Sequence, residues 1–137
     1  MKEFILYRGG YKYQLAETYV CQTEIRPPQD IATEFILLNR FGILTVKRGY
    51  AFDGPSGPAI DTPSAMRGSL IHDAGYQLLR LGLLSQSTRR QWDALYKQAC
   101  LEDGMWKIRA WAHFDVLRMF GANAAKVGSE PGVLRAP

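Results

Sequence analysis

The chain has 137 residues, of which 47% are hydrophobic and 22% charged, and its formal net charge is +4. This length excludes two large domains, while the apolar content suffices for one buried core. The densest basic groups are Arg89-Arg90 and Lys107 with Arg109. Because they lack the interleaved aromatic residues of a basic nucleic-acid-binding stripe, nucleic acid is not an expected partner.

Two features of the sequence bear on its compartment. Cys21 and Cys100 lie far apart without metal-ligand spacing, which favours two reduced, buried thiols and leaves a disulfide as the alternative. No segment has the length and apolar character of a signal peptide core or a membrane span. We therefore expect a cytosolic-type protein without a signal peptide or a transmembrane segment.

The first half of the chain is expected to form strands, because apolar and polar residues alternate and β-branched and aromatic residues are frequent. The candidate strands are residues 12–25, 33–38 and 43–50. Asn39 and Gly42 tolerate positive φ and predict a tight connection between the last two strands. An antiparallel meander is the simplest arrangement of these strands.

A loop is predicted between residues 52 and 64, where glycines and prolines exclude a regular helix and a central strand. It contains Asp53 and Ser56, with Asp61 near its end. Carboxylates and loop carbonyls are oxygen ligands that suit calcium, magnesium or another divalent cation. The alternative is a turn held by bonds from these side chains to the backbone.

Three helices are predicted in the second half. The first begins at Ser64 as N-cap and ends near Gly82, the second extends from Ser87 to Gly104, and the third covers residues 105–120. The stripes expected to be buried are Leu70, Ile71, Ala74, Leu78 and Leu81 in the first helix, Trp92, Leu95, Tyr96 and Ala99 in the second, and Ile108, Trp111, Ala112, Val116 and Met119 in the third.

These elements predict an α+β fold, with a small antiparallel sheet from the N-terminal half packed against about three helices from the C-terminal half. Gly121 is expected to stop the third helix. Beyond it the small and polar residues offer little to bury, so we expect one domain over residues 1–121 and a flexible tail over residues 122–137.

The first predicted helix carries the residues that most favour chemistry. His72 and Tyr76 share a face, because they are four residues apart, and Asp73 is rotated by about 100° from His72. Asp93 lies at the edge of the apolar stripe of the second helix and needs a donor, for which His72 and Tyr76 are best placed. A His–Asp pair indicates a general base, and the alternative is a structural histidine whose bonds are satisfied.

A weaker pair of candidates lies in the third predicted helix. His113 and Asp115 are both able to take part in chemistry. The helix also needs a polar side facing water, and this explains both residues without a function.

Four separated runs carry a family resemblance: GYAFDGPS at 49–56, LIHDAGY at 70–76, RQWDALY at 90–96 and VLRMFG at 116–121. Over residues 43–121 the chain resembles the phage- and prophage-associated domain of unknown function 1353 family. The resemblance implies a bacteriophage origin, a location in the host cytoplasm or the virion, and phage structural proteins as partners, but no settled activity. The shared positions correspond to Asp53, Ser56, His72, Asp73, Tyr76 and Asp93.

A looser resemblance is to phospholipases A2, which also place His-Asp-x-x-Tyr on one helix and a carboxylate on an antiparallel helix. It implies His72 as the base that activates water, Asp73 as a calcium ligand, and Tyr76 and Asp93 as supporting residues, with a lipid or other ester as substrate. The chain departs from these enzymes in lacking their disulfide framework and their glycine-rich calcium loop in its usual spacing, for which the Asp53 loop would have to substitute.

Three hypotheses for function follow. The first is a metal-assisted ester hydrolase, with His72, Asp93 and Tyr76 as catalytic and supporting residues and Asp73 and Asp53 around a divalent cation. The second is a non-catalytic virion, tail or assembly accessory protein in which the polar cluster only fixes the helices. The third is a binder of host proteins or nucleic acid. The sequence leaves the substrate and the oligomeric state open.

Overall fold

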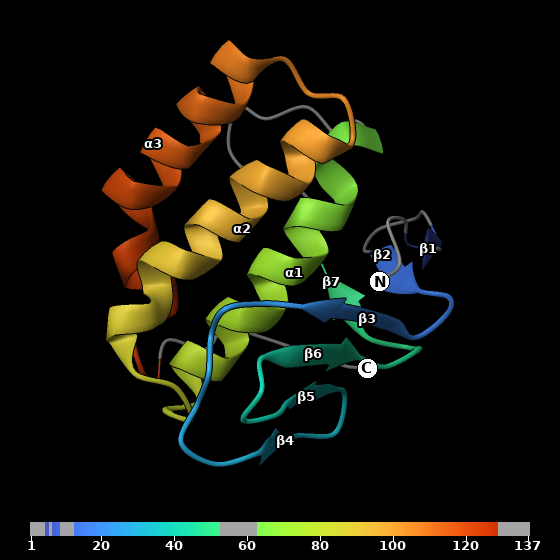
Figure 1. Ribbon diagram of the computed structural model, residues 1–137, viewed down its shortest axis with the longest axis vertical. Coiled ribbons are helices and arrows are strands. Elements are labelled where there is room, and N and C mark those ends of the chain that lie inside the picture. The colour runs from blue at the N-terminus through green and yellow to red at the C-terminus, as the bar shows by residue number, and fades with distance from the viewer. Residues whose placement is uncertain (1–4, 6, 9–12, 53–62, 129–137) are drawn as a thin grey trace. The chain divides into compact units, whose positions relative to one another are not determined.

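A computed structural model describes residues 5, 7–8, 13–52 and 63–128 of the chain (Figure 1). These residues belong to two compact units, a strand-rich unit within residues 5–52 and a helical unit within residues 63–128. The predicted α+β class is confirmed, with antiparallel strands in the N-terminal half and three α-helices among the described residues of the C-terminal half. One domain over residues 1–121 stays a prediction.

The described strands form two antiparallel sheets. The first has the order β1-β2-β7 and consists of Tyr7–Arg8, Tyr13–Leu15 and Ala51–Phe52. The second has the order β3-β6-β5-β4 and consists of Tyr19–Gln22, Ile43–Val46, Ile36–Leu38 and Ile31–Ala32. In β3, Tyr19 and Cys21 are buried while the two residues between and after them are exposed, as expected of a strand with one covered face.

The predicted strand at 12–25 is divided into two, β2 and β3, which belong to different sheets. The chain bends between them, where the hydroxyl of Thr18 accepts a hydrogen bond from the backbone N–H of Arg48 at 3.0 Å. The predicted strand at 43–50 is likewise shorter, because β6 ends at Val46 and Gly49 adopts a φ of +95° in a turn. The alternation of residue types does not reveal such local breaks.

The predicted tight connection between β5 and β6 is confirmed. The side-chain oxygen of Asn39 accepts from the backbone N–H groups of Phe41 and Ile43 at 2.9 and 3.0 Å. Gly42 has a φ of +88°, and a Cβ there would collide with the carbonyl oxygen of Thr23.

The helical unit consists of α1 (Pro63–Arg80), a 3-10 turn η1 (Gln86–Thr88), α2 (Arg89–Glu102) and α3 (Lys107–Ala125). In Figure 1, α2 lies between α1 and α3. Gly82 and Gly104, at φ values of +73° and +101°, follow the ends of α1 and α2 as predicted.

Three predicted helix boundaries are wrong. Ser64 lies inside α1, which begins one residue earlier. Ser85, not Ser87, supplies the side-chain cap, and it caps the 3-10 turn ahead of α2. Gly121 does not stop α3, because it is buried within a helix that continues to Ala125. Four residues assigned to a flexible tail are therefore helical, and positions 129–137 lie outside the described residues.

The buried stripes predicted for α1 and α2 are mostly confirmed. In α1, the exception is Leu81, which follows the helix and is 45% exposed. In α2, Leu95 is only partly buried. Gly75 of α1 lies against the ring of Trp92, where a Cβ would collide with the indole. This missing side chain lets α1 and α2 approach closely enough to bring their polar residues together.

The buried stripe predicted for α3 is wrong. All five of its members, Ile108, Trp111, Ala112, Val116 and Met119, are exposed. The buried residues are instead Ala110, Phe114, Gly121 and Ala125. Because α3 has apolar residues on all sides, periodicity does not decide which side faces the other helices. The side that is buried is set by the packing of α3 on the other helices.

Two observations concern the expected compartment of the chain, namely the state of its cysteines and the character of its helices. Cys21 and Cys100 are buried and form no disulfide with each other. Burial raises the pKa of the Cys100 thiol to about 11. Among the described helices, none combines the length and the apolar character that a membrane crossing requires.

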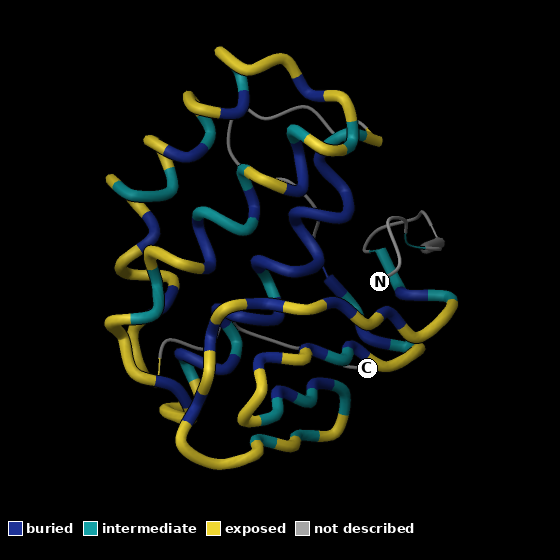
Figure 2. The backbone as a smooth tube through the Cα atoms, viewed as in Figure 1, coloured by how far each residue is buried: buried dark blue, intermediate teal, exposed yellow. Residues whose placement is uncertain are grey.

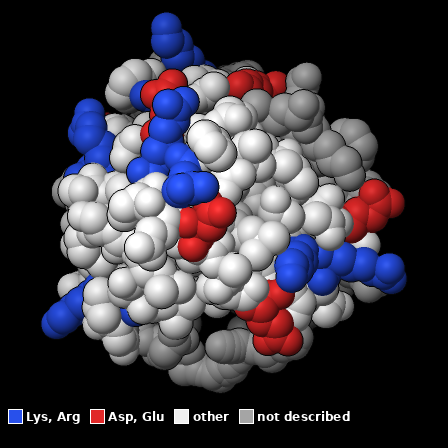
Figure 3. Space-filling view, turned by 60° about the horizontal axis from the view of Figure 1, so that its bottom comes forward, with Lys and Arg blue, Asp and Glu red and all other residues white. Residues whose placement is uncertain are grey.

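Charged side chains are dispersed on the face drawn in Figure 3, where Lys and Arg stand in separate groups and Asp or Glu lies close to several of them. One such pair is Arg40 with Asp30, whose Nε and Oδ1 atoms are 3.5 Å apart. This agrees with the scattered charges of the sequence, and the expectation that nucleic acid is not a partner stays a prediction.

Candidate functional site

Asp93 is the centre of a buried polar cluster to which all three helices contribute. Its Oδ1 atom lies 2.8 Å from Nε2 of His72 and accepts from the hydroxyl of Tyr76 at 2.7 Å, both from α1. Its Oδ2 atom accepts from Nη1 of Arg118, on α3, at 2.9 Å. Asp93 has no exposed surface, so these donors replace the water that its carboxylate loses on folding. The expected contact of Asp93 with His72 and Tyr76 is present.

Arg89 fixes α3 against this cluster. Its guanidinium Nη1 lies 3.6 Å from Oδ2 of Asp93 and donates to the hydroxyl of Tyr76 at 3.3 Å. It also donates to the backbone carbonyl of Leu117 at 3.1 Å. A Cβ on Gly121 would lie 2.5 Å from the Tyr76 hydroxyl and 2.8 Å from Nη1 of Arg89, so any side chain there would displace one or both of these groups.

Arg89 and Arg118 were missed by the sequence reasoning. A signal for Arg89 exists, because it precedes Asp93 by four residues and therefore lies on the same face of α2. No comparable spacing links Arg118 to Asp93, since the two residues meet only through the packing of α3 on α2.

The electrostatics of the cluster favour a neutral His72 beside an ionised Asp93. Burial lowers the pKa of His72 and outweighs the bond to Asp93, which raises it, while the charges of Arg89 and Arg80 lower it further. Burial raises the pKa of Asp93, but the hydrogen bonds from His72, Tyr76 and Arg118 outweigh it and leave the pKa lowered. The pKa of the Tyr76 phenol is raised, first by burial and then by its bond to Asp93.

His72 is buried, with 8% of its area exposed, but less completely than Asp93, which has no exposed area. An ionised Asp93 only accepts, so the contacting Nε2 atom carries the hydrogen and Nδ1 holds a lone pair. Within the described part of the chain, no hydrogen bond to Nδ1 occurs. The ring is held between Tyr76, at a centroid distance of 3.9 Å, and the edge of Tyr96, at 5.8 Å. The arrangement is chemically that of an oriented imidazole base.

Of the two predicted cation ligands, the structure describes Asp73 but not Asp53. Asp73 follows His72 on α1 and is partly buried. Asp53 and Ser56 lie outside the described residues. Among the residues that are described, no group of three or more His, Cys, Asp and Glu residues is arranged to hold a metal ion. A calcium or other divalent-cation site at Asp73 and Asp53 stays a prediction.

His113 and Asp115 do not join the Asp93 cluster. Nδ1 of His113 lies 2.8 Å from the hydroxyl of Tyr96, and the two rings are stacked with centroids 5.9 Å apart. Burial, and secondarily the charge of Arg109, lower the pKa of His113. Asp115 is exposed on α3.

Comparisons with family models, with curated proteins and with solved structures each found no match to this chain. The resemblance of its four sequence runs to the phage-associated family, and of its helix to phospholipases A2, therefore stays a prediction.

Proposed function

We propose that this chain is a phage-encoded hydrolase of carboxylic esters, similar in its chemistry to a phospholipase A2, with His72 as the general base. The 2.8 Å contact between Nε2 of His72 and Oδ1 of the buried Asp93 carries this proposal. The contact selects the tautomer whose Nδ1 atom is basic, and the lowered pKa keeps the imidazole neutral at neutral pH.

In the proposed reaction, Nδ1 of His72 takes a proton from water as the water oxygen attacks the ester carbonyl carbon. Asp93 stabilises the imidazolium that forms, and Tyr76 and Arg118 hold the Asp93 carboxylate in place. Collapse of the tetrahedral intermediate breaks the bond to the alkoxide, which receives the proton from Nδ1, and leaves the carboxylic acid. Asp73 and Asp53 are proposed to hold a divalent cation such as calcium, which supplies charge stabilisation for the developing oxyanion.

The test compares wild type, His72→Gln and His113→Asn on mixed phospholipid vesicles and on a panel of simple esters, each with calcium and with chelator. The Gln side chain can still donate to Asp93 but cannot act as a base at neutral pH. His113→Asn is the matched control, because His113 is a histidine of the same unit that is bonded to Tyr96 rather than to Asp93. We expect His72→Gln to lower turnover by about 10²–10⁴-fold and His113→Asn to leave it nearly unchanged.

Two outcomes separate the parts of this proposal. Turnover that needs His72 but survives the chelator would retain the base and remove the cation. The absence of turnover on every ester by folded, calcium-loaded wild type would reject the hydrolase.

A second candidate function is supported by the complete burial of Asp93 and by its contacts to all three helices. Such a network also serves a non-catalytic phage virion, tail or assembly accessory protein, in which it only fixes the helix packing. In that case His72→Gln would retain co-purification with phage particles or with another phage protein. A chain that is absent from particles and binds no phage protein would exclude this candidate.

A further inference from the structure

α3 is apolar on the side that faces away from α1 and α2 as well as on the side that packs against them. Its outer face is defined here by Ile108, Val116, Met119 and Phe120, which are 86%, 42%, 70% and 69% exposed. At 100° per residue, Val116, Met119 and Phe120 are rotated by about 80°, 20° and 120° from Ile108, so the four residues lie on one side of the helix, within about a third of its circumference. Figure 2 shows the outer side of α3 as exposed.

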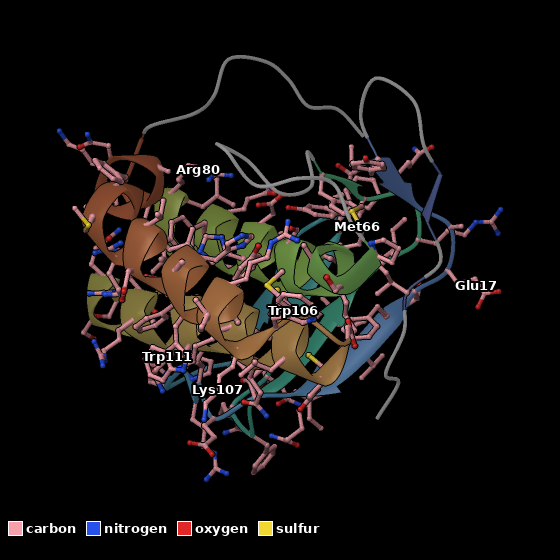
Figure 4. The ribbon with its side chains drawn as sticks, turned by 90° about the horizontal axis from the view of Figure 1, so that it is seen from above. Glu17, Met66, Arg80, Trp106, Lys107 and Trp111 are labelled. Atoms are coloured by element: carbon pink, nitrogen blue, oxygen red, sulfur yellow. The ribbon has the colours of Figure 1, made fainter. Side chains whose placement is uncertain are left out.

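The outer face is bordered by tryptophan and lysine. Trp106, which precedes the first turn of α3, is 84% exposed. Trp111 is 46% exposed, and Nζ of Lys97 lies 3.3 Å from the centroid of its ring. Figure 4 shows Lys107 and Trp111 on the same side of the helical unit, away from Arg80. Exposed apolar residues with aromatic and basic neighbours are typical of surfaces that bind an interface between water and lipid.

A second copy of the chain fits this face poorly. In a two-fold symmetric dimer the same surface of both chains is in contact. Two α3 helices that pair antiparallel through the outer face would therefore cross near the middle of the helix. Asp115, which is exposed near that point, would then approach its own copy.

We propose that the outer face of α3 binds an anionic lipid surface, with the helix lying in the plane of the interface. Ile108, Met119 and Phe120 enter the boundary between headgroups and acyl chains, and the neighbouring lysines contact lipid phosphates. An anionic surface complements the basic border, and a flat lipid interface receives a projecting helix without the matching groove that a protein partner needs. This binding is independent of the proposed base His72.

The test measures flotation of the full-length chain with vesicles of phosphatidylcholine alone and with vesicles that also contain phosphatidylglycerol. Phe120→Ser is compared with Phe41→Ser, a matched control from the strand-rich unit, because the two phenylalanines are 69% and 66% exposed. We expect binding to the anionic vesicles, roughly ten-fold weaker for Phe120→Ser and nearly unchanged for Phe41→Ser. Binding should also weaken as salt is added.

Three results would overturn the proposal. They are the absence of flotation by folded wild type, equal binding by both phenylalanine variants, and a dimer in analytical ultracentrifugation that Phe120→Ser dissociates. Hydrolysis is measured separately on the panel of simple esters, so failure of lipid binding and failure of ester hydrolysis are separate results.

Discussion

The two ends of α2 each anchor a buried charge, and the two charges are stabilised differently. Near the first turn, Asp93 accepts from donors that are themselves buried or partly buried. At the last turn, Arg67 from α1 contacts Glu102 at 2.7 Å and Asp103 at 3.0 Å. The side chains of these two partners are 46% and 18% exposed, so water can replace Arg67 there.

This difference separates a structural ion pair from a candidate site. The partners of Arg67 are two carboxylates, and the C-terminal end of a helix also favours a cation. The partners of Asp93 include His72, whose imidazole can take up a proton and whose second nitrogen has no partner among the described residues. Burial of a charge is common to both ends, but only the Asp93 end combines it with a group that can transfer a proton.

The largest expected effect is on stability when either central charge is removed. Asp93→Ala leaves His72, Tyr76 and Arg118 without their acceptor, and we expect it to lower the free energy of unfolding by about 3–5 kcal/mol. Arg67→Ala should cost about 1–3 kcal/mol, because Glu102 and Asp103 regain water. Urea denaturation measures both, with Asp115→Ala as an exposed control. Equal losses of unfolding free energy in Asp93→Ala and Arg67→Ala would contradict the proposed difference between the two ends of α2.

A smaller effect is expected when one donor to Asp93 is removed. Tyr76→Phe loses a hydrogen bond to an ionised acceptor and should lower the free energy of unfolding by about 1.5–3 kcal/mol. Tyr96→Phe is the matched control, because its hydroxyl contacts the neutral His113 and should cost only about 0.5–1.5 kcal/mol. A larger loss for Tyr96→Phe would indicate that Asp93 is not ionised.

The smallest effect is a dependence of the free energy of unfolding on pH. The cluster around Asp93 produces it, and the ion pairs of Arg67 at the other end of α2 do not. His72 has a lower pKa in the folded protein than the value of 6.5 expected for the unfolded chain. Unfolding therefore takes up a proton between the two values, and stability falls as the pH decreases below about 6.5, by at most about 1.4 kcal/mol per pH unit for one proton.

His113 contributes in the same direction, because its pKa is also lowered. Thermal unfolding between about pH 7 and 5 should show the decline in wild type, a smaller one in His72→Gln, and nearly none in His72→Gln/His113→Asn. Arg67→Ala should keep the wild-type decline, since Glu102, whose pKa Arg67 lowers through a hydrogen bond, acts only below its unfolded value of 4.5. The same slope in all variants would show that neither histidine is buried in its neutral form.

Much of the Asp93 cluster could be predicted from the sequence. Helical periodicity places Asp93 beside a buried tryptophan, and the cost of burying a carboxylate then demands donors that only a neighbouring helix can supply. His72 and Tyr76 fit because their spacing puts both on one face. The structure brings the three residues together.

The contribution of α3 could not be predicted in the same way. Its large apolar residues suggested one buried face, but Ala110, Phe114, Gly121 and Ala125 pack inward instead. Which side of an all-round apolar helix is buried depends on how closely its neighbours approach, and this is a property of the assembled helices. Because the rotation of α3 was wrong, Arg118 was not placed near Asp93.

Gly121 imposes a constraint that should be visible across evolution. The space that its missing side chain leaves is filled by the Tyr76 hydroxyl and by the guanidinium of Arg89. The three positions are therefore not free to vary independently, although they are far apart in the sequence. In any homologous chain that replaces this glycine, the tyrosine or the arginine should be replaced by a smaller residue, so the three positions should covary.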